Sequence, residues 1–446
     1  MERSTPATSF AFQDIYLSLS YKTPPPTSRA VHSRESLLAL LKGGGMIWLS
    51  LENGGSRMLS PEDLPSLPMS GVVDADGHIL EAPDLWEQYL EPQYRDRAVR
   101  IRKDADGLEY LEVNGKPSKM TRKGAPSGLG VMDRLGGIEY KREPTGSGYV
   151  DKASFGSMDP KERLKRLDIE NIEKVFLYPT IGLLWEPECE DLELSMAYAR
   201  AYNRWLVDFC SDSGGRLIPI AHIPIGIPEL AEEELRRAAK DGMRGFFVAP
   251  YIWSRQAHSH PDHDRVFAAA QELDMPFGIH PSFEPHWAVP TRFGRMTSFS
   301  TAFYQNITGG DAIRGGFTSL FQYGVFDKFP NLKVIILEIG AGWIGYWLER
   351  MDAVYESPLG KSVPLKNKPS EYFRRQCWIS GDPDERSLAG VIPFVGEDRF
   401  FWASDFPHAD HPPEYIPNLI ELTNLMSKSA RVGLLGKNVL TCYGMD

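Results

Sequence analysis

The chain has 446 residues, of which 42% are hydrophobic and 24% charged, a composition typical of globular proteins with a sizeable core. Its formal net charge of −11 and its pI near 5.5 argue against nucleic acid or an anionic membrane surface as the main partner. The four cysteines are scattered without CxxC spacing, which indicates reduced thiols and a cytoplasmic location. The longest apolar run, residues 334–348, is interrupted by Glu338 and several glycines, so no membrane-spanning helix is predicted.

Proline and glycine runs interrupt the first part of the chain, at positions 24–26, 43–45 and 54–55. We expect residues 1–70 to form an N-terminal extension that packs on the main domain or on a second subunit, or to be largely disordered. Regular alternation of strand and helix patterns begins only after it. The sequence therefore predicts one main domain over residues 71–446.

The first well-defined strand pattern is Val72-Val73-Asp74-Ala75-Asp76-Gly77-His78. Because a strand alternates its side chains between two faces, Asp74, Asp76 and His78 are expected to share one face. Three ionisable groups on a buried face need a partner, and a divalent metal is the simplest one for carboxylate oxygen and imidazole nitrogen. The alternative is a strand end with a solvated aspartate and a hydrogen-bonded histidine.

Residues 97–157 interrupt the alternation that this strand begins. Val99–Lys103 and Leu108–Val113 alternate around Asp106-Gly107, which predicts a hairpin. The glycine-rich remainder reads as a long insertion after the first strand, and long ordered insertions often form lids or interfaces.

From Asp159 onward, strand and helix patterns take turns to the end of the chain. After the opening strand, further strands are predicted at Val175–Tyr178, Leu217–Ile223, Gly245–Val248, Pro276–His280, Lys333–Glu338, Cys377–Ser380 and Arg399–Ser404. Helices are predicted at Asp159–Glu170, Asp191–Asp212, Glu229–Lys240, Asp262–Leu273, Ile313–Phe326, Trp343–Tyr355, Asp384–Pro393 and Ser427–Leu435. Eight such units most simply close into an α/β fold, the (β/α)8 TIM barrel. A doubly wound open sheet is the second choice, but no glycine-rich phosphate turn follows any strand.

In such barrels the active site lies at the carboxyl ends of the strands. Five of the predicted strands end in ionisable residues: Asp76 and His78, His222, His280, Glu338, and Asp405. Each has a structural alternative, since His222 could be a core histidine and Glu338 a buried ion-pair partner. Their recurrence at the same end of five strands favours a metal site.

Several motifs come in one order and together span Gly71 to the C-terminus. They are Asp74-Ala75-Asp76-Gly77-His78, Gly278-Ile279-His280-Pro281, Phe329-Pro330-Asn331-Leu332-Lys333-Val334, Ser404-Asp405-Phe406-Pro407-His408 and Leu435-Gly436-Lys437-Asn438. In these motifs the sequence resembles the amidohydrolase superfamily, in the branch that contains aminocarboxymuconate-semialdehyde decarboxylase and gamma-resorcylate decarboxylase.

The resemblance implies a distorted (β/α)8 barrel with one divalent metal ion, zinc as the first choice and manganese or iron as alternatives. Its ligands would be Asp76, His78, His280 and Asp405. Two residues depart from the family pattern. Asp76 stands where the family usually has His or Glu, and Glu338 stands where the decarboxylases carry the His of an HGGG-like stretch. That His is thought to position the substrate carboxylate or move a proton, so the second departure speaks against decarboxylation.

Two imidazoles and two carboxylates would leave a divalent ion open to water, whose pKa falls toward ~7 and makes hydroxide available. We assign the acid–base role to Glu338, whose pKa an apolar pocket would raise, with Asp405 and His222 as further catalytic candidates. The first choice is therefore a metal-dependent hydrolase acting on a small cyclic or aromatic compound. The alternative is a nonoxidative decarboxylase of an aromatic or related acid. A barrel that binds metal or ligand without turnover is a third possibility.

Aromatic and polar side chains follow the fifth strand, as the wall around a ring-containing substrate requires. The substrate-binding candidates are Phe283, His286, Trp287 and Arg292 in this loop, and Tyr178 on the second strand. A packed aromatic loop at a subunit contact is the alternative. The expected partners are a small-molecule substrate and further copies of the chain, in a homodimer or higher homo-oligomer. We expect residues 97–157 and 281–310 over the carboxyl-end mouth, and few contacts there from residues 1–70.

Overall fold

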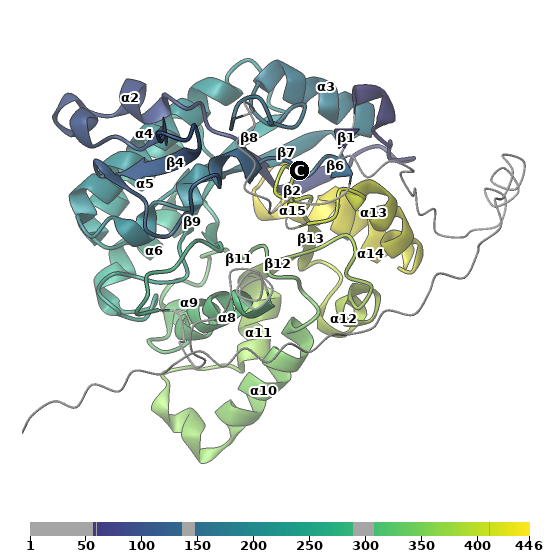
Figure 1. Ribbon diagram of the computed structural model, residues 1–446. Coiled ribbons are helices and arrows are strands. Elements are labelled where there is room, and N and C mark those ends of the chain that lie inside the picture. Colours follow the sequence, from purple (N-terminus) through teal and green to yellow (C-terminus); the bar gives the residue numbers. More distant parts are fainter. Residues whose placement is uncertain (1–56, 59, 136–147, 289–306, 410) are drawn as a thin grey trace, which may run out of the picture. The chain divides into compact units, whose positions relative to one another are not determined.

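The computed structural model describes residues 57–58, 60–135, 148–288, 307–409 and 411–446. Within this part of the chain, eight parallel strands stand side by side in a nearly closed barrel with helices around it (Figure 1). The expected α/β class and distorted (β/α)8 barrel are confirmed. The barrel strands in chain order are β2 (Val73–Ile79), β7 (Lys174–Pro179), β8 (Leu217–His222), β9 (Gly245–Val248), β10 (Phe277–Ile279), β11 (Val334–Ile336), β12 (Cys377–Gly381) and β13 (Phe400–Trp402).

The first and last barrel strands meet at their carboxyl ends. The N–H of Asp405 donates to the C=O of Asp76 at 3.0 Å, and the N–H of His78 donates to the C=O of Phe406 at 2.7 Å. These bonds lie beyond the last residue of β13, where the chain runs alongside β2. The barrel is therefore closed at the end where the ionisable residues gather.

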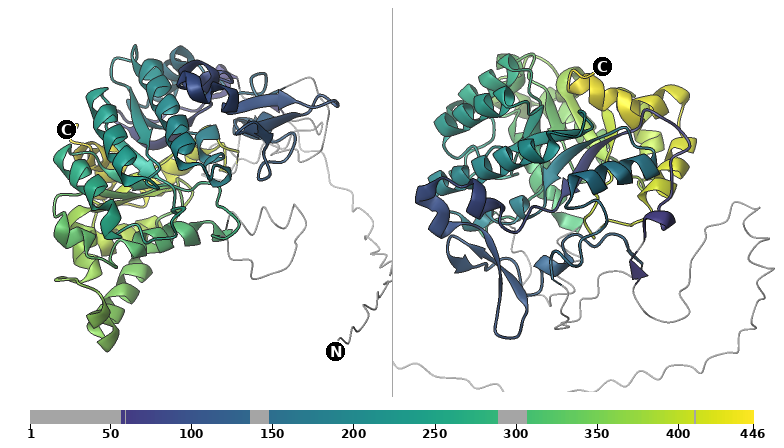
Figure 2. Two further views of the ribbon diagram at one scale, coloured as in Figure 1. Left: turned by 90° about the vertical axis from the view of Figure 1, so that its left-hand side faces the viewer. Right: turned by 90° about the horizontal axis from the view of Figure 1, so that it is seen from above.

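Helices surround the barrel, as the three views in Figures 1 and 2 show. Helix α3 (Pro160–Glu170) is capped at its N-terminus by Asp159, whose side chain accepts hydrogen bonds from the N–H groups of Lys161 and Glu162. At its C-terminus it is capped by Asn171, which has a φ of 59°. The helices of the described residues are α2 (Leu85–Tyr89), α3 (Pro160–Glu170), α4 (Leu192–Cys210), α5 (Pro228–Lys240), α6 (Asp264–Glu272), α8 (Gly310–Ser319), α9 (Val325–Lys328), α10 (Ile344–Glu356), α11 (Pro369–Gln376), α12 (Leu388–Val395), α13 (Tyr415–Asn424), α14 (Lys428–Val432) and α15 (Asn438–Cys442).

Several helices differ from the sequence-based expectation. The helix expected over residues 313–326 is two helices, α8 and α9, because Gly324 between them has a φ of 68°. The sequence pattern does not predict α11 or α13. Helix α13 carries Pro417 in its first turn, where a proline reads as an interruption, and α11 is short and runs directly into β12.

The barrel interior is filled by apolar side chains that alternate with those facing the helices. Tyr443, which follows α15, closes the amino end, and its ring lies 4.3 Å from that of Phe176. Gly245 permits this contact, because a Cβ there would lie 2.6 Å from the Tyr443 ring. The amino end of the barrel interior is therefore filled by side chains, while the ionisable residues lie at its carboxyl end.

The insertion after β2 contains the expected hairpin. Strands β3 (Arg100–Lys103), β4 (Glu109–Val113) and β5 (Lys116–Pro117) form a small antiparallel sheet. Further along, the N–H of Met132 donates to the C=O of Pro407 at 3.2 Å, so this part of the insertion reaches the carboxyl end of the barrel.

Strand β6 (Arg134–Leu135), two residues beyond Met132, pairs antiparallel with β1 (Arg57–Met58). The described end of the N-terminal extension is thus paired with the insertion close to the mouth, nearer than we expected. Among the described residues, no helix is long and apolar enough to cross a membrane.

Candidate metal centre

A bulge in β2 decides which of its acidic residues face the barrel interior. Asp74 of β2 pairs with Val175 of β7, and the next paired residues are Gly77 and Leu177. Strand β2 thus uses three residues where β7 uses two, which is a β-bulge. Asp74 therefore lies on the helix side with Gly77, where it accepts hydrogen bonds from Ser404 N (3.0 Å) and Oγ (2.6 Å). The expectation that Asp74 shares a face with Asp76 and His78 is wrong, because strict alternation does not allow for the extra residue.

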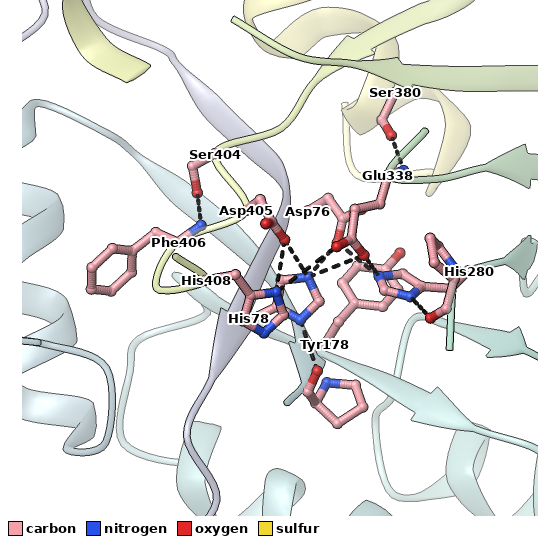
Figure 3. Close-up of polar contacts among 12 residues, drawn as sticks. Asp76, His78, Tyr178, His280, Glu338, Ser380, Ser404, Asp405, Phe406 and His408 are labelled. Atoms are coloured by element: carbon pink, nitrogen blue, oxygen red, sulfur yellow. Dashed lines mark hydrogen bonds and ion pairs between the residues drawn. The ribbon is translucent and has the colours of Figure 1, made fainter. Parts of the chain in front are cut away.

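Asp76, His78, His280 and Glu338 point toward one place from three strand ends (Figure 3). Each of the four offers a ligand atom, and these atoms all lie within 4.8 Å of one another. Oδ1 of Asp76 is 3.6 Å from Nε2 of both histidines, and Oε2 of Glu338 is 2.9 Å from Nε2 of His280. The four side chains are almost entirely buried, Glu338 being the most exposed at 11%.

Backbone carbonyls fix the orientation of both histidine rings. Nδ1 of His78 lies 2.7 Å from the C=O of Pro179, and Nδ1 of His280 lies 2.8 Å from that of Pro281. A carbonyl oxygen only accepts, so Nδ1 carries the proton in each ring and Nε2 turns its lone pair to the centre. This is the arrangement in which imidazoles bind metals.

Asp405 reaches the same centre from beyond β13 and is surrounded by imidazoles. Its Oδ1 is 3.0 Å from Nε2 of His78 and 3.0 Å from Nδ1 of His408, and its Oδ2 is 2.5 Å from Nδ1 of His411. It forms a second group of convergent ligand atoms with His78, Glu338 and His408. The two groups of ligand atoms thus have His78 and Glu338 in common.

Electrostatics in the centre are dominated by the mutual effect of carboxylates and imidazoles. Burial raises the pKa of Asp76. Burial acts in the same direction on Glu338, but the adjacent His280 lowers the pKa of Glu338 to about 2. Burial lowers the pKa of His280, yet Glu338 and Asp76 raise it to about 10. The expectation that an apolar pocket raises the pKa of Glu338 is wrong, because the side chain lies against an imidazole.

The donor atoms fit a divalent cation. Buried atoms without a hydrogen-bond partner among the described residues include both carboxylate oxygens of Asp76, Nε2 of His78, Nε2 of His280, Oε2 of Glu338 and Oδ2 of Asp405. Leaving such atoms unpaired is costly, and a cation held between them would give several of them a partner. It would also supply the positive charge that otherwise requires a proton on His280. These residues form a candidate metal site.

His222 lies outside this group of ligand atoms. Its Nε2 is 2.9 Å from Oε2 of Glu186, its ring stacks on Phe247 with centroids 4.6 Å apart, and Asn203 binds both its N–H and its C=O. These contacts are those of a buried histidine with a carboxylate partner. A catalytic role for His222 stays a prediction.

The predicted substrate-binding residues are spread over two places. Tyr178 is buried in the barrel beneath the centre, where its ring stacks on His280 (5.1 Å) and its hydroxyl contacts that of Tyr443 at 3.2 Å. Phe283 and His286 are exposed at the start of the loop after β10, and Trp287 packs edge-on against other aromatic rings. Arg292 lies outside the described residues.

Sequence reasoning did not nominate His408 and His411. The ring of His408 lies 3.9 Å from that of His78, and its Nε2 is 3.0 Å from Oγ1 of Thr180. The available signal was their position in the sequence, since they follow Asp405 by three and six residues, after the eighth barrel strand.

The fold and the centre define a class of protein, the (β/α)8 barrels with carboxylate and imidazole side chains gathered at the carboxyl ends of the strands. A family model described as amidohydrolase matches residues 187–444, more than half of the chain, and the chain belongs to that family.

Curated relatives with similar sequences are decarboxylases. The gamma-resorcylate decarboxylase of Rhodococcus jostii (strain RHA1) is 25% identical over 324 residues, covering 67% of this chain and 92% of the relative. That of Rhizobium sp. (strain MTP-10005) is 26% identical over 275 residues, covering 57% and 79%.

Solved structures share the fold. An amidohydrolase from Mycobacterium avium subsp. paratuberculosis K-10 has a TM-score of 0.71 at 21% identity, covering 84% of this chain and 99% of that one. The 5-carboxyvanillate decarboxylase of Novosphingobium aromaticivorans DSM 12444, complexed with manganese, has a TM-score of 0.57 at 18% identity, covering 84% and 96%.

These comparisons correct the first choice of function. The reading as a metal-dependent hydrolase is wrong, and the alternative, a decarboxylase, agrees with the relatives. The error has a physical origin. One metal centre serves both kinds of chemistry, so the choice depended on Glu338, whose negative charge was taken to repel a substrate carboxylate.

Proposed function

We propose that this protein is a metal-dependent, nonoxidative decarboxylase of an aromatic acid. The observation that carries the proposal is the 25% identity to a gamma-resorcylate decarboxylase over 92% of that enzyme's length. The candidate metal centre supports it, because its convergent ligand atoms lie at the carboxyl ends of the barrel strands.

Manganese is the metal that we propose. The centre offers three carboxylates, Asp76, Glu338 and Asp405, against the two oriented imidazoles of His78 and His280. Oxygen-rich donor sets suit Mn²⁺, whereas zinc favours imidazole and thiolate. The manganese in the 5-carboxyvanillate decarboxylase structure agrees with this choice. When bound, the ion would neutralise the substrate carboxylate and hold it in the centre.

The reaction adds a proton and needs no oxidant. The bond between the ring carbon and the carboxylate breaks, its electron pair stays on the ring carbon, that carbon takes the proton, and carbon dioxide leaves. We assign transfer of the proton to Asp405 Oδ2, which lies 2.5 Å from Nδ1 of His411 and would pass on a proton that this imidazole supplies. His408 holds the other oxygen of Asp405 at 3.0 Å and so orients the carboxylate.

The loop after β10, which follows His280 in the chain, carries part of an aromatic cluster. Trp287 packs edge-on against Tyr251 and Trp253, with ring centroids 5.9 and 6.0 Å away, and the guanidinium of Arg255 lies 4.7 Å above its ring. We propose that Phe283, exposed earlier in this loop, and Trp287 face the substrate ring.

The test uses 2,6-dihydroxybenzoate as the probe, since relatives of this fold act on it. Chain treated with a chelator and reloaded with Mn²⁺ should release one carbon dioxide for each resorcinol formed, without added oxidant. Removal of the metal should abolish the release, and Mn²⁺ should restore it. If neither this acid nor 5-carboxyvanillate loses carbon dioxide while metal is bound, the proposal is overturned.

We also propose an oligomeric state and a cellular location for this protein. A homodimer or higher homo-oligomer in the cytoplasm would agree with the acidic composition and the reduced thiols. Light scattering of the purified chain would measure the assembly.

A further inference from the structure

We propose that Glu81 and Thr180 are positioning residues of the decarboxylase reaction, acting through residues 179–183, the β7 turn. This turn begins at the last residue of β7 and contacts two imidazoles of the candidate metal centre and the loop after β10. Neither Glu81 nor Thr180 belongs to the two groups of convergent ligand atoms. The inference rests on the proposed function and adds to it the residues that hold the centre in shape.

A buried carboxylate holds the β7 turn. Glu81 lies two residues beyond the end of β2 and is fully buried. Its Oε1 accepts the N–H groups of Thr180 at 3.2 Å and Gly182 at 2.8 Å. Its Oε2 accepts the N–H of Ile181 at 2.9 Å. The first N–H groups of a helical turn have no partner within the turn, and a carboxylate is a strong acceptor for them. Glu81 therefore fixes the backbone of the β7 turn.

The first contact of the β7 turn is with a candidate metal ligand. The C=O of Pro179 lies 2.7 Å from Nδ1 of His78 and so turns Nε2 of that ring toward the centre. Gly182 packs closely against Pro179, because a Cβ on Gly182 would lie 2.5 Å from the proline Cβ. Glu81 binds the N–H of Gly182, so it stabilises the turn that directs this carbonyl.

The second contact is with the imidazole that orients Asp405. Oγ1 of Thr180 lies 3.0 Å from Nε2 of His408, and Nδ1 of His408 lies 3.0 Å from Oδ1 of Asp405. A carboxylate only accepts hydrogen bonds, so Nδ1 carries a proton and the ring donates to Asp405. The hydroxyl of Thr180 binds the opposite side of the ring. Thr180 therefore fixes the plane in which His408 meets the carboxylate.

The two imidazoles that the β7 turn holds also contact each other. The ring centroids of His78 and His408 lie 3.9 Å apart, and both rings point into the centre (Figure 3). A shift of the turn would therefore move both rings. The metal-facing Nε2 of His78 and the proton-transferring carboxylate of Asp405 depend on the same five residues.

The third contact is with the loop that we propose to face the substrate ring. The C=O of Leu183, the last residue of the β7 turn, accepts the N–H of Phe283 at 3.0 Å. One turn thus joins the candidate metal site, the group that moves the proton and the start of the aromatic loop. A residue that only stabilised the fold would not need contacts with all three.

The two contacts with imidazoles use different atoms, so variants separate them. Thr180→Val removes the hydroxyl that binds His408 and leaves the backbone carbonyl that binds His78. Glu81→Gln keeps the size of the side chain but replaces one acceptor oxygen with an NH₂ group, which cannot accept the N–H groups of the turn. The first variant should affect proton transfer alone, and the second should affect both proton transfer and metal binding.

The experiment measures Mn²⁺ affinity by calorimetric titration of the metal-free full chain, kcat and KM of the Mn²⁺-loaded chain, and folding by circular dichroism. Thr180→Val should bind Mn²⁺ as the wild type does but lose about 10–100-fold in kcat, part of the ~10²–10⁴ that a positioned proton-transfer group contributes. Its KM should be unchanged, as expected when an interaction acts only in the transition state. Thr180→Ser, which keeps the hydroxyl, should recover most of kcat.

Glu81→Gln should weaken Mn²⁺ binding about 10–100-fold, the effect typical of losing a group that supports a ligand. It should also lower kcat when Mn²⁺ is saturating. If Glu81→Gln does not fold, Gly182→Ala takes its place, because the added Cβ would displace Pro179 and should weaken Mn²⁺ binding in the same way. Equal Mn²⁺ affinity of the folded variant and the wild type would overturn the role of Glu81.

Thr423→Val is the matched control for the loss of a buried hydroxyl. Thr423 is buried, and its hydroxyl donates to the C=O of Leu419 at 2.8 Å within α13. This variant should keep the Mn²⁺ affinity and kcat of the wild type. The role of Thr180 is overturned if folded Thr180→Val keeps the wild-type kcat, or if Thr180→Ser is as slow as Thr180→Val.

A measurement without turnover separates this inference from the proposed function. In NMR spectra of metal-free, histidine-labelled chain, Thr180→Val should move the ring-nitrogen signal that is absent from His408→Gln, and Thr423→Val should leave it in place. A wild type that binds Mn²⁺ but releases no carbon dioxide would overturn the proposed function. The ring-nitrogen signal and the Mn²⁺ affinities would then decide the positioning roles, and an unmoved signal in Thr180→Val would overturn that of Thr180.

Discussion

A proton and a metal ion compete for the same atom, Nε2 of His280. In the absence of metal, Glu338 and Asp76 raise the pKa of this imidazole to about 10, so it is protonated at neutral pH. Its Nδ1 is engaged with the C=O of Pro281, which leaves Nε2 as the site of both proton and metal. Metal binding therefore has to displace a proton.

Metal affinity should consequently rise with pH. At pH 7.5, binding of Mn²⁺ should release about one proton per chain, because His280 goes from protonated to neutral. Calorimetric titrations in buffers of different ionisation enthalpy measure this number. A release near zero would mean that His280 is neutral before the metal binds.

The same pKa has a consequence for stability without metal. The folded-state pKa of His280 lies above the unfolded value. The stabilising contribution of His280 to the free energy of unfolding is therefore fully present below pH ~6.5 and is lost as the pH rises through about 10. Metal-free protein should lose this contribution over that interval, and metal-loaded protein should not. Thermal unfolding at several pH values distinguishes the two forms.

At the scale of elements, the two strands that close the barrel depend on one buried carboxylate. Asp74 accepts two hydrogen bonds from Ser404, whose hydroxyl also accepts the N–H of Phe406 at 3.0 Å. Asp405, between these residues, has a φ of 53°. Asp74 therefore fixes the turn that carries Asp405, from the opposite face of β2.

Replacing Asp74 by Ala should weaken metal binding, although Asp74 faces away from the candidate metal centre. The change leaves the Ser404 donors unpaired, and loss of such a supporting group typically weakens metal binding about 10–100-fold. Ser404→Ala, which removes only the hydroxyl, is the matched control and should cost less. Mn²⁺ titration of folded, metal-free variants measures both. Equal affinity of Asp74→Ala and wild type would show that the turn keeps its shape unaided.

The elements differ in how far the sequence predicts them. All eight barrel strands are predicted because their apolar runs are short, bounded and followed by polar ends, as at Gly245–Val248. Helix α13 is missed because Pro417 in its first turn hides its periodicity. The bulge in β2 and the left-handed residues Glu338 and Asp405 leave no periodic signal, so the orientation of the acidic side chains could not be predicted.

At the scale of the whole described chain, one arginine ties distant segments together. Arg166 on α3 forms ion pairs with Asp133 of the insertion at 2.7 Å and with Glu170 at 2.9 Å, and all three are buried. Its guanidinium lies 3.7 Å from the centre of the Phe406 ring, next to the candidate metal centre. The guanidinium of Arg166 therefore contacts the insertion, α3 and the turn after β13 at the same time.

Arg166→Met should destabilise the fold strongly. It leaves two carboxylates buried without their cation, which typically costs about 3–5 kcal/mol. Arg216→Met is the control, because its partner Asp168 is exposed and such pairs contribute ~0–1 kcal/mol. Urea unfolding of both variants measures the free energy of unfolding. A loss below ~1 kcal/mol in Arg166→Met would mean that the two acidic residues find other partners.

The bond between Asp74 and Ser404 joins residues 330 positions apart. During synthesis at about 5–20 residues per second, the ribosome needs roughly 16–66 s to reach the second partner after making the first. Throughout that interval Asp76 and His78 lack the strand-eight turn that pairs with the end of β2. The part of the candidate metal centre that contains Asp405 therefore cannot be complete before the eighth barrel strand has been made.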